Sequence, residues 1–186
     1  MIKRFITIII TSLLLLLIQS SPAYDLIRIS LGAKPDLLLI FTVFIGFRYG
    51  SANGVVYGFI IGLMQDLISS ATFGAYALIF LNIGFFVGFL NASIFVRQVT
   101  AGIFVTLVGY LIKVIALFLV SAIYSELSNV AVLIRSELFV ALPLTVIISS
   151  PLFLIFEKVA PILYDKDKIM VGDNTQSYIE KQIYKE

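Results

Sequence analysis

The chain has 186 residues, of which 60% are hydrophobic and 13% charged, and its mean hydropathy is +1.08. Soluble domains average about 45–50% apolar and about 25% charged residues, so the composition excludes a water-soluble domain and indicates a membrane-embedded one. The absence of Cys and His excludes disulfides, thiolate nucleophiles, imidazole or thiolate metal sites and Ser-His-Asp catalysis, and a net charge of +2 gives no indication of nucleic-acid binding.

The chain begins with a short basic segment and a long apolar run. Lys3 and Arg4 precede apolar residues 5–18, and a Ser-Pro-Ala sequence follows shortly after. This order resembles a signal peptide cut after Ala23, but it also fits an uncleaved first membrane span over residues 5–22. We favour the uncleaved span because further spans follow. In both cases we expect the basic residues to stay in the cytoplasm.

Five further apolar stretches follow a mixed polar segment. Residues 25–36 predict an outer loop with a short interfacial helix around residues 26–31, and Pro35 suits the first position of the next helix. The residues after 160 are charged and predict a short cytoplasmic tail over 161–186. The apolar stretches together predict an all-α, six-transmembrane helix bundle over residues 1–160, with approximate spans at 5–22, 36–49, 52–68, 75–96, 99–124 and 138–156.

The second of these spans is short. Its apolar part, residues 37–47, has 11 residues and would rise about 17 Å along a helix, whereas the hydrocarbon core is about 30 Å thick. This stretch crosses the membrane only if flanking residues extend its helix. If it forms a re-entrant arm instead, the chain has five spans. Six spans put both termini on one side, and the distribution of basic residues predicts that this side is the cytoplasm. The flanks on that side carry Lys3, Arg4, Arg48, Arg97 and Lys158, against Arg28, Lys34 and Arg135 on the other.

Glycines recur every four residues across the second and third spans. This glycine ladder consists of Gly46, Gly50, Gly54, Gly58 and Gly62, and a second pair, Gly84 and Gly88, lies in the fourth span. Stripes of small residues let two helix backbones approach closely in lipid. The stripe is therefore expected either to pack inside the bundle, with the second pair as its natural partner, or to form a docking groove for another protein's helix. A ligand-facing surface is a third interpretation.

Two charged residues fall inside predicted spans. An unpaired charge at mid-bilayer costs about 2.5–3.5 kcal/mol on insertion scales. Asp66 and Lys113 each lie 14 residues from the cytoplasmic end of their span, which corresponds to about 21 Å, and we predict that they contact each other. The alternative is that Asp66 marks the end of its helix while Lys113 reaches the membrane surface along its flexible side chain.

Asp36, Arg48 and Asn82 complete the set of buried polar or functional candidates. Asp36 follows Pro35, where a carboxylate would meet the positive end of a helix dipole. The pair Asp36 and Asp66 is compatible with acid–base chemistry, but no other catalytic group accompanies it, and the sequence has no glycine-rich phosphate loop with its Lys. We therefore expect no enzymatic activity, no cofactor and no metal.

The first half of the chain resembles the rod shape-determining protein MreD family. The resemblance covers about 45 residues, and its pieces are characteristic in combination although each is weak alone. Its order is Pro-Asp, a short span, Arg-x-Gly, a glycine-rich span, Asp-Leu and Gly. The residues that carry it are Lys34 to Leu39 (Lys-Pro-Asp-Leu-Leu-Leu), Arg48 to Ser51 (Arg-Tyr-Gly-Ser), the glycine ladder, Gln65 to Ser69 (Gln-Asp-Leu-Ile-Ser), Phe73-Gly74 and Tyr76-Ala77.

The resemblance implies a component of the cell-elongation machinery in the bacterial inner membrane. Members of this family work beside MreC, MreB, RodA and an elongation-specific penicillin-binding protein, guide peptidoglycan synthesis along the side wall and so determine rod cell shape, and have no attributed catalytic activity. The fold of the family is similar to that of the substrate-binding subunits of energy-coupling-factor vitamin transporters. Lys113 is not part of the pattern that carries the resemblance.

Two functions follow as hypotheses. The leading one is a membrane scaffold whose glycine face binds the single membrane span of MreC. The alternative is a small-molecule (vitamin)-binding membrane subunit of a transporter, which needs a polar cavity. The candidate lining residues of such a cavity are Asp36, Asp66, Asn82, Asn91 and Lys113.

Overall fold

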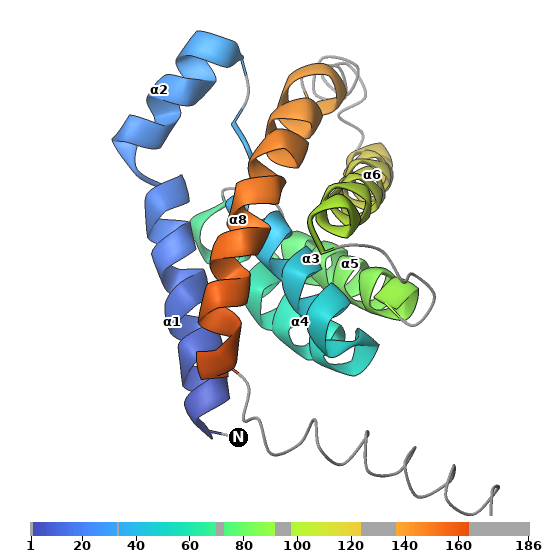
Figure 1. Cartoon of the computed structure of the whole chain (residues 1–186). Helices are drawn as coiled ribbons and strands as arrows, with labels where there is room; N and C mark the ends of the chain where they lie inside the picture. Colours follow the sequence, from blue (N-terminus) through green and yellow to red (C-terminus); the bar gives the residue numbers. More distant parts are fainter. Residues whose placement is uncertain (1, 33, 70–72, 92–97, 124–136, 164–186) are drawn as a thin grey trace, which may run out of the picture.

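The computed structural model describes residues 2–32, 34–69, 73–91, 98–123 and 137–163, and these residues contain helices but no strand. The all-α prediction is therefore confirmed for this part of the chain. The elements, labelled in Figure 1, are α1 (Ile2–Gln19), α2 (Pro22–Leu31), α3 (Leu37–Tyr49), α4 (Ser51–Ile68), α5 (Ala75–Asn91), α6 (Gln98–Ile123), the π-helical turn η1 (Glu137–Ala141) and α8 (Leu142–Leu163).

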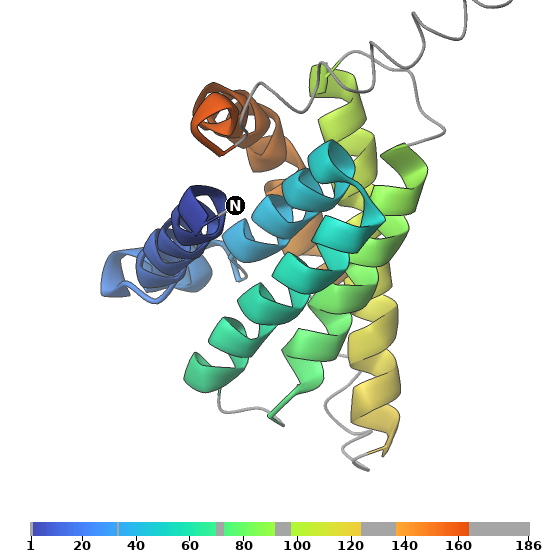
Figure 2. The same ribbon diagram turned by 90° about the horizontal axis from the view of Figure 1, so that it is seen from below.

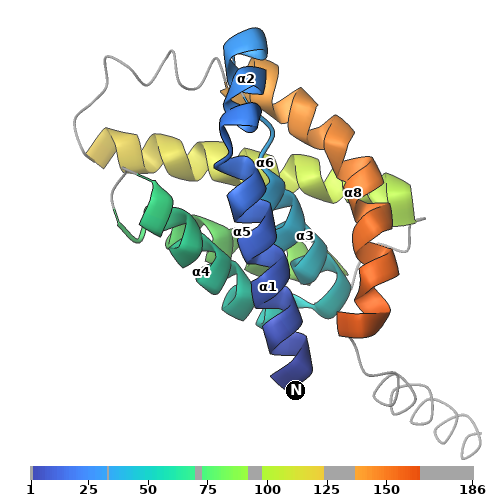
Figure 3. The ribbon, with the colours of Figure 1, turned by 90° about the vertical axis from the view of Figure 1, so that its left-hand side faces the viewer.

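The short helix α3 lies at the centre of the bundle. It contacts α1, α4, α5, α6 and α8, and all of its residues from Leu37 to Gly46 are buried. A helix that is surrounded on every side has no need of a polar face, which explains why its sequence is apolar all round. Figure 2 shows α4 and α5 side by side, and Figure 3 shows α6 crossing behind α1.

Three of the described helices are long and apolar enough to cross a membrane: Ser51–Ile68, Gly102–Val120 and Glu137–Lys158. Three shorter apolar helices, Phe5–Gln19, Leu37–Tyr49 and Ala75–Leu90, accompany them. The chain is thus a membrane-embedded helical protein, and the count of six spans stays a prediction. Residues 92–97, 124–136 and 164–186 lie outside the described residues, so the ends of two predicted spans and most of the predicted tail fall there.

The N-terminal helix α1 packs against α3, α4 and α8. Its inward face consists of Ile8, Ser12, Leu15 and Leu16, all buried. The opposite face is broad and apolar, as expected of a helix that borders lipid. The large exposed side chains on it are Phe5, Ile6, Ile10, Leu13, Leu14, Leu17 and Ile18.

The helix α2 follows α1 after a break at residues 20–21 and corresponds to the predicted interfacial helix, although it begins earlier. Pro22 is the first residue of α2. The sequence predicts Pro35 as the first residue of the next helix, but α3 begins two residues later, at Leu37, and Asp36 between them is its N-cap. The prediction for Pro35 is therefore wrong by two positions.

The turn η1 leads directly into α8, whose second residue is Pro143. Pro143 has no N–H group, so it cannot donate to the carbonyl of Phe139 four residues earlier. One wider, π-helical turn stands at this point in place of a regular one, as is common where the helical ladder is interrupted. The hydroxyl of Thr145 donates to the Ala141 carbonyl at 2.6 Å and so links η1 to the first turns of α8.

Candidate functional site

The helices α4 and α5 touch along their backbones. A Cβ atom added to Gly54 would lie 2.2 Å from the carbonyl oxygen of Gly84, and one added to Gly84 would lie 2.1 Å from that of Gly54. Gly58 and Gly62 meet backbone atoms of α5 at 2.4 Å in the same way. At Gly88 the nearest backbone atoms belong to Ser51, at 2.4 Å. Only glycine fits at these positions without a shift of the backbone.

The glycine ladder is therefore occupied within the chain. The α5 helix fills the face that the sequence offered as a groove for another protein's helix, so that interpretation is wrong for Gly54, Gly58 and Gly62. Gly46 joins the same contact, since its Cβ would lie 2.8 Å from the Gly84 carbonyl oxygen. Gly50 has a different role: its φ of +83° makes the turn between α3 and α4, a conformation that favours glycine.

Asp66, at the end of α4, caps the start of α5. Its Oδ1 accepts the N–H of Tyr76 and its Oδ2 accepts the N–H of Ala77, both at 3.0 Å. A carboxylate at this place satisfies two free N–H groups of the first helical turn and meets the positive end of the helix dipole. Gly74, with a φ of +94°, lies in the turn that brings the two helices together. The Asp-Leu…Phe-Gly…Tyr-Ala part of the family pattern thus has a local structural reason.

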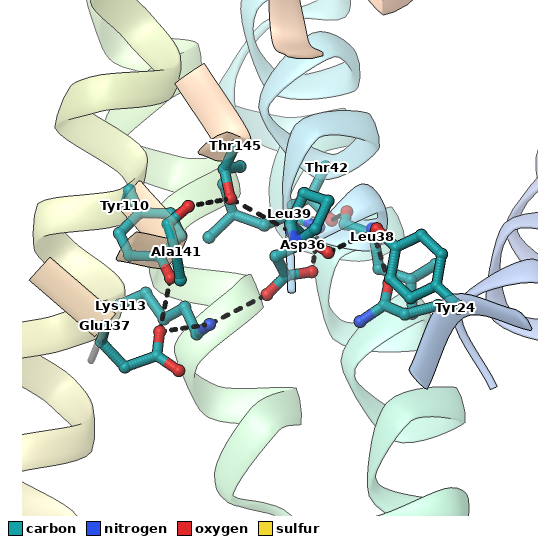
Figure 4. Close-up of polar contacts among 12 residues, drawn as sticks. Tyr24, Asp36, Leu38, Leu39, Thr42, Tyr110, Lys113, Glu137, Ala141 and Thr145 are labelled. Carbon is teal, nitrogen blue, oxygen red and sulfur yellow. Dashed lines mark hydrogen bonds and ion pairs between the residues drawn. The ribbon is translucent and has the colours of Figure 1, made fainter. Parts of the chain in front are cut away.

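The predicted contact between Asp66 and Lys113 is wrong. Both Asp66 oxygens accept backbone N–H groups, and Lys113 is engaged elsewhere. Its Nζ lies 3.1 Å from Asp36 Oδ2 and 3.1 Å from Glu137 Oε2. It also lies 4.8 Å from the centroid of the Tyr110 ring, within the range of a cation–π interaction. Figure 4 shows this cluster, which we call the Lys113 cluster: Asp36, Tyr110, Lys113 and Glu137.

Asp36 enters the cluster from the N-terminus of α3. Its Oδ1 accepts the N–H of Leu39 at 3.0 Å, so one oxygen caps the helix while the other faces Lys113. Its own N–H donates to Thr145 Oγ1 at 3.2 Å, which ties α3 to α8 (Figure 4). The predicted role of Asp36 at a helix start is confirmed, and the structure adds the ion pair.

Sequence reasoning missed two members of the cluster, Tyr110 and Glu137. Hydropathy placed Glu137 at the end of a polar loop, outside the span that follows. In the structure it opens η1, and its Oε2 accepts hydrogen bonds from Lys113 at 3.1 Å and from the Tyr110 hydroxyl. A signal was available: an acidic residue directly before an apolar run is a candidate partner for a cation inside a neighbouring span.

Polar contacts extend from this cluster to the first two helices. Gln19 Oε1 accepts the N–H of Leu38 at 3.4 Å, and the Tyr24 hydroxyl donates to the Pro35 carbonyl at 2.7 Å. Lys34 Nζ donates to the Gln19 carbonyl at 3.3 Å. Burial, and then the nearby Asp36 carboxylate, raise the pKa of the Tyr24 phenol above its usual range. The start of α3 is thus bonded to α1, α2, α6 and α8.

The other predicted site residues do not join the cluster. Arg48 is exposed near the end of α3. Asn82 is exposed on α5, where its Nδ2 donates to the Leu78 carbonyl at 2.7 Å within the same helix. The side chain of Asn91 lies outside the described residues. Of the four proposed cavity-lining residues whose side chains are described, Asp36 and Lys113 pair with each other, whereas Asp66 and Asn82 bond to backbone groups.

The Lys113 cluster holds buried charges by ion pairing around one lysine. The side chains of Lys113 and Asp36 are only 8% and 9% exposed, and a buried ion pair of this kind offsets its desolvation only when its hydrogen bonds are satisfied. Among the described residues, no group of three or more His, Cys, Asp or Glu side chains is placed to hold a metal ion. The arrangement is suited to fixing helices against one another.

Comparison with known proteins gives a family match. The family described as rod shape-determining protein MreD matches residues 1–160, a range that includes every residue of the Lys113 cluster and of the glycine contact. No curated protein and no solved structure matches the chain.

Proposed function

This chain belongs to the MreD family of rod shape-determining proteins, and we propose on that premise that it is a non-enzymatic component of the bacterial cell-elongation machinery. In this proposal it lies in the inner (cytoplasmic) membrane as a multi-pass protein with both termini in the cytoplasm. It binds MreC and helps to direct lateral peptidoglycan synthesis, and with it rod shape. MreB, RodA and an elongation-specific penicillin-binding protein are the further candidate partners.

The observation that carries this proposal is the family match over residues 1–160. The packing of the described residues supports a scaffold. The α4–α5 contact is closed backbone to backbone, and small-residue contacts of this kind hold membrane helices together without a hydrophobic driving force. The α4–α5 hairpin packs against the buried central helix α3, and a fixed arrangement of this kind presents a surface of constant shape to partners.

The charged groups also favour a scaffold over an enzyme. Lys113 forms ion pairs with both Asp36 and Glu137, and Asp66 is engaged by two backbone N–H groups. Catalytic carboxylates must reach a substrate proton, whereas these are occupied by the fold itself. A lipid-processing enzyme predicts turnover that Asp66→Asn abolishes in protein that remains folded; the proposal predicts that Asp66→Asn acts on stability alone.

The contact with MreC cannot use the glycine face, because α5 covers it. We propose that the membrane helix of MreC binds an outer face of the bundle. Photo-crosslinking residues placed at exposed positions on three helices, Leu14, Phe86 and Ile147, locate that face, with the unsubstituted chain as the background control. One exposed position should crosslink to MreC above this background. Equal crosslinking at all three positions, or none, contradicts a specific contact.

Depletion in the native cell tests the proposed role. We expect depleted cells to lose rod shape, with wall synthesis no longer confined to the side wall, and expect the intact chain to restore both. Normal cell shape combined with a defect in vitamin uptake contradicts the proposal and favours the transporter alternative. Mass spectrometry of the purified protein is a second readout: a tight co-purifying small molecule also favours that alternative.

A further inference from the structure

The two carboxylates that face Lys113 are held in different ways. Asp36 is 9% exposed, and besides Lys113 it bonds Leu39 through its second oxygen and Thr145 through its N–H. Glu137 is 26% exposed. Its Oε2 accepts hydrogen bonds from two side chains of α6, Lys113 and Tyr110. Asp36 is therefore also anchored to its own helix and to α8, whereas both of these bonds of Glu137 go to α6.

The charges reinforce this asymmetry. One lysine faces two carboxylates, so the Asp36–Lys113 pair alone is neutral, whereas Glu137 adds a surplus negative charge. Surplus charge is costly where the effective dielectric constant is low. Release of Glu137 to the surface would leave a neutral pair behind, but release of Asp36 would also uncap α3. The Tyr110 hydroxyl loses its acceptor when Glu137 leaves, which favours the closed arrangement at rest.

The backbone provides a hinge in the same place. Glu137 begins the π turn η1, and Pro143 follows two residues after its end, so the helical ladder is already interrupted there. Thr145 is fully buried and bonds both Asp36 and Ala141. The chain is thus fixed to α3 at Thr145. Ahead of Ala141, Leu138 and Val140 pack against the hydrophobic core, the Glu137 side chain bonds the turn to α6, and Phe139 within the turn is 76% exposed.

We propose that Glu137 is the releasable arm of a latch. While it binds Lys113 and Tyr110, η1 is closed onto α6. When it lets go, η1 moves away from α6 about Ala141, and the Asp36–Lys113 pair keeps the rest of the bundle in place. This conformational device goes beyond the proposed function and does not depend on it.

The absence of cysteine makes the latch measurable by spin labelling in liposomes. One label pair joins Phe139→Cys in η1 to Ile115→Cys on α6, and a reference pair joins Ile147→Cys on α8 to the same α6 position. All three side chains are exposed, at 76%, 60% and 70%, so the labels displace no core packing. In the Glu137→Ala variant, which removes the acceptor oxygen together with the charge, we expect the 139–115 distances to shift to longer values while the 147–115 distances stay unchanged.

Three control variants sharpen the test. Glu157→Ala makes the same truncation on α8 and should shift neither pair. Tyr110→Phe removes one hydrogen bond to Glu137 without changing the charge, so it should give a smaller shift of the 139–115 pair, and it also tests the proposal if Glu137→Ala does not fold. Asp36→Asn leaves Lys113 paired with Glu137 alone and should not lengthen the 139–115 distances.

Two results would overturn the latch. Unchanged 139–115 distances in both Glu137→Ala and Tyr110→Phe show that Glu137 does not hold η1. Equal lengthening of the 139–115 and 147–115 distances in Glu137→Ala shows that the charge cluster merely stabilises the whole of α8.

Discussion

Gly54 on α4 and Gly84 on α5 are in mutual backbone contact, each placed so that a Cβ atom on one would lie within 2.2 Å of the carbonyl oxygen of the other. The atoms that would be struck belong to the main chain, which cannot rotate away as a side chain can. This contact is part of the close packing of the α4–α5 hairpin, which Gly58, Gly62 and Gly88 extend.

Gly54→Ala should therefore destabilise the protein strongly. Overpacking of a well-packed contact costs about 1–3 kcal/mol and occasionally more, and we expect the upper end because two helix axes must separate. The measurement is thermal unfolding in detergent. Ala52→Leu, at an exposed position of the same helix, is the control and should leave the melting temperature nearly unchanged. A Gly54→Ala variant as stable as this control contradicts the contact.

Asp66→Ala should cost about 0.5–2 kcal/mol, the usual loss for a helix N-cap. Asp66→Asn should cost less, since its amide oxygen still accepts one of the two N–H groups, although the favourable charge–dipole interaction is lost. Thermal unfolding of both variants gives the order. Asp66→Asn proving the less stable of the two would show that the carboxylate does something other than cap α5.

Lys113→Met should be the most damaging of the single charge removals. It leaves Asp36 and Glu137 as buried or half-buried carboxylates without their cation, and breaking a buried pair in this way costs about 3–5 kcal/mol. The triple variant with Asp36→Asn and Glu137→Gln removes the stranded charges and should recover most of the lost stability. Chemical unfolding of the two variants in detergent compares them. Failure of the triple variant to improve on Lys113→Met would mean that the loss is steric.

The buried phenol of Tyr24 predicts that the protein loses stability as the pH becomes alkaline. Its pKa is raised above the ordinary value of 10.0 by burial and then by Asp36, so the folded phenol keeps its proton where the unfolded one loses it. The stability that Tyr24 contributes is fully present below pH 10 and declines as the pH rises above it. Tyr24→Phe cannot ionise, so its melting temperature should fall less steeply between about pH 9 and 11. Parallel slopes for the two proteins contradict a buried phenol.

Much of the architecture follows from local sequence pattern. The apolar runs predict helices near their observed positions because hydropathy and length are properties of a single segment. The place of Asp36 at the start of α3 is equally local, since a cap depends on the next three residues. Gly84 and Gly88 were natural partners for the glycine ladder because both rows have the same spacing, and the structure brings them together.

The partners of Lys113 were beyond such reasoning. Counting residues from the cytoplasmic ends gave Asp66 and Lys113 the same depth, but depth is one coordinate and the direction in which a side chain points around its helix is another. In the structure Asp66 faces the first turn of α5 and Lys113 faces α3 and η1. The sequence placed Glu137 in a loop, because hydropathy shows where an apolar run begins but not whether the residue just before it packs into the protein.

The sequence by itself determined that this is a membrane-embedded helical protein of the MreD family, because composition, helix period and a linear motif are all readable along one chain. Only the tertiary structure decided that the small-residue face is closed by α5 and that the buried lysine binds two carboxylates from distant segments. Those choices depend on how helices rotate and tilt against one another, which packing sets and no single segment encodes.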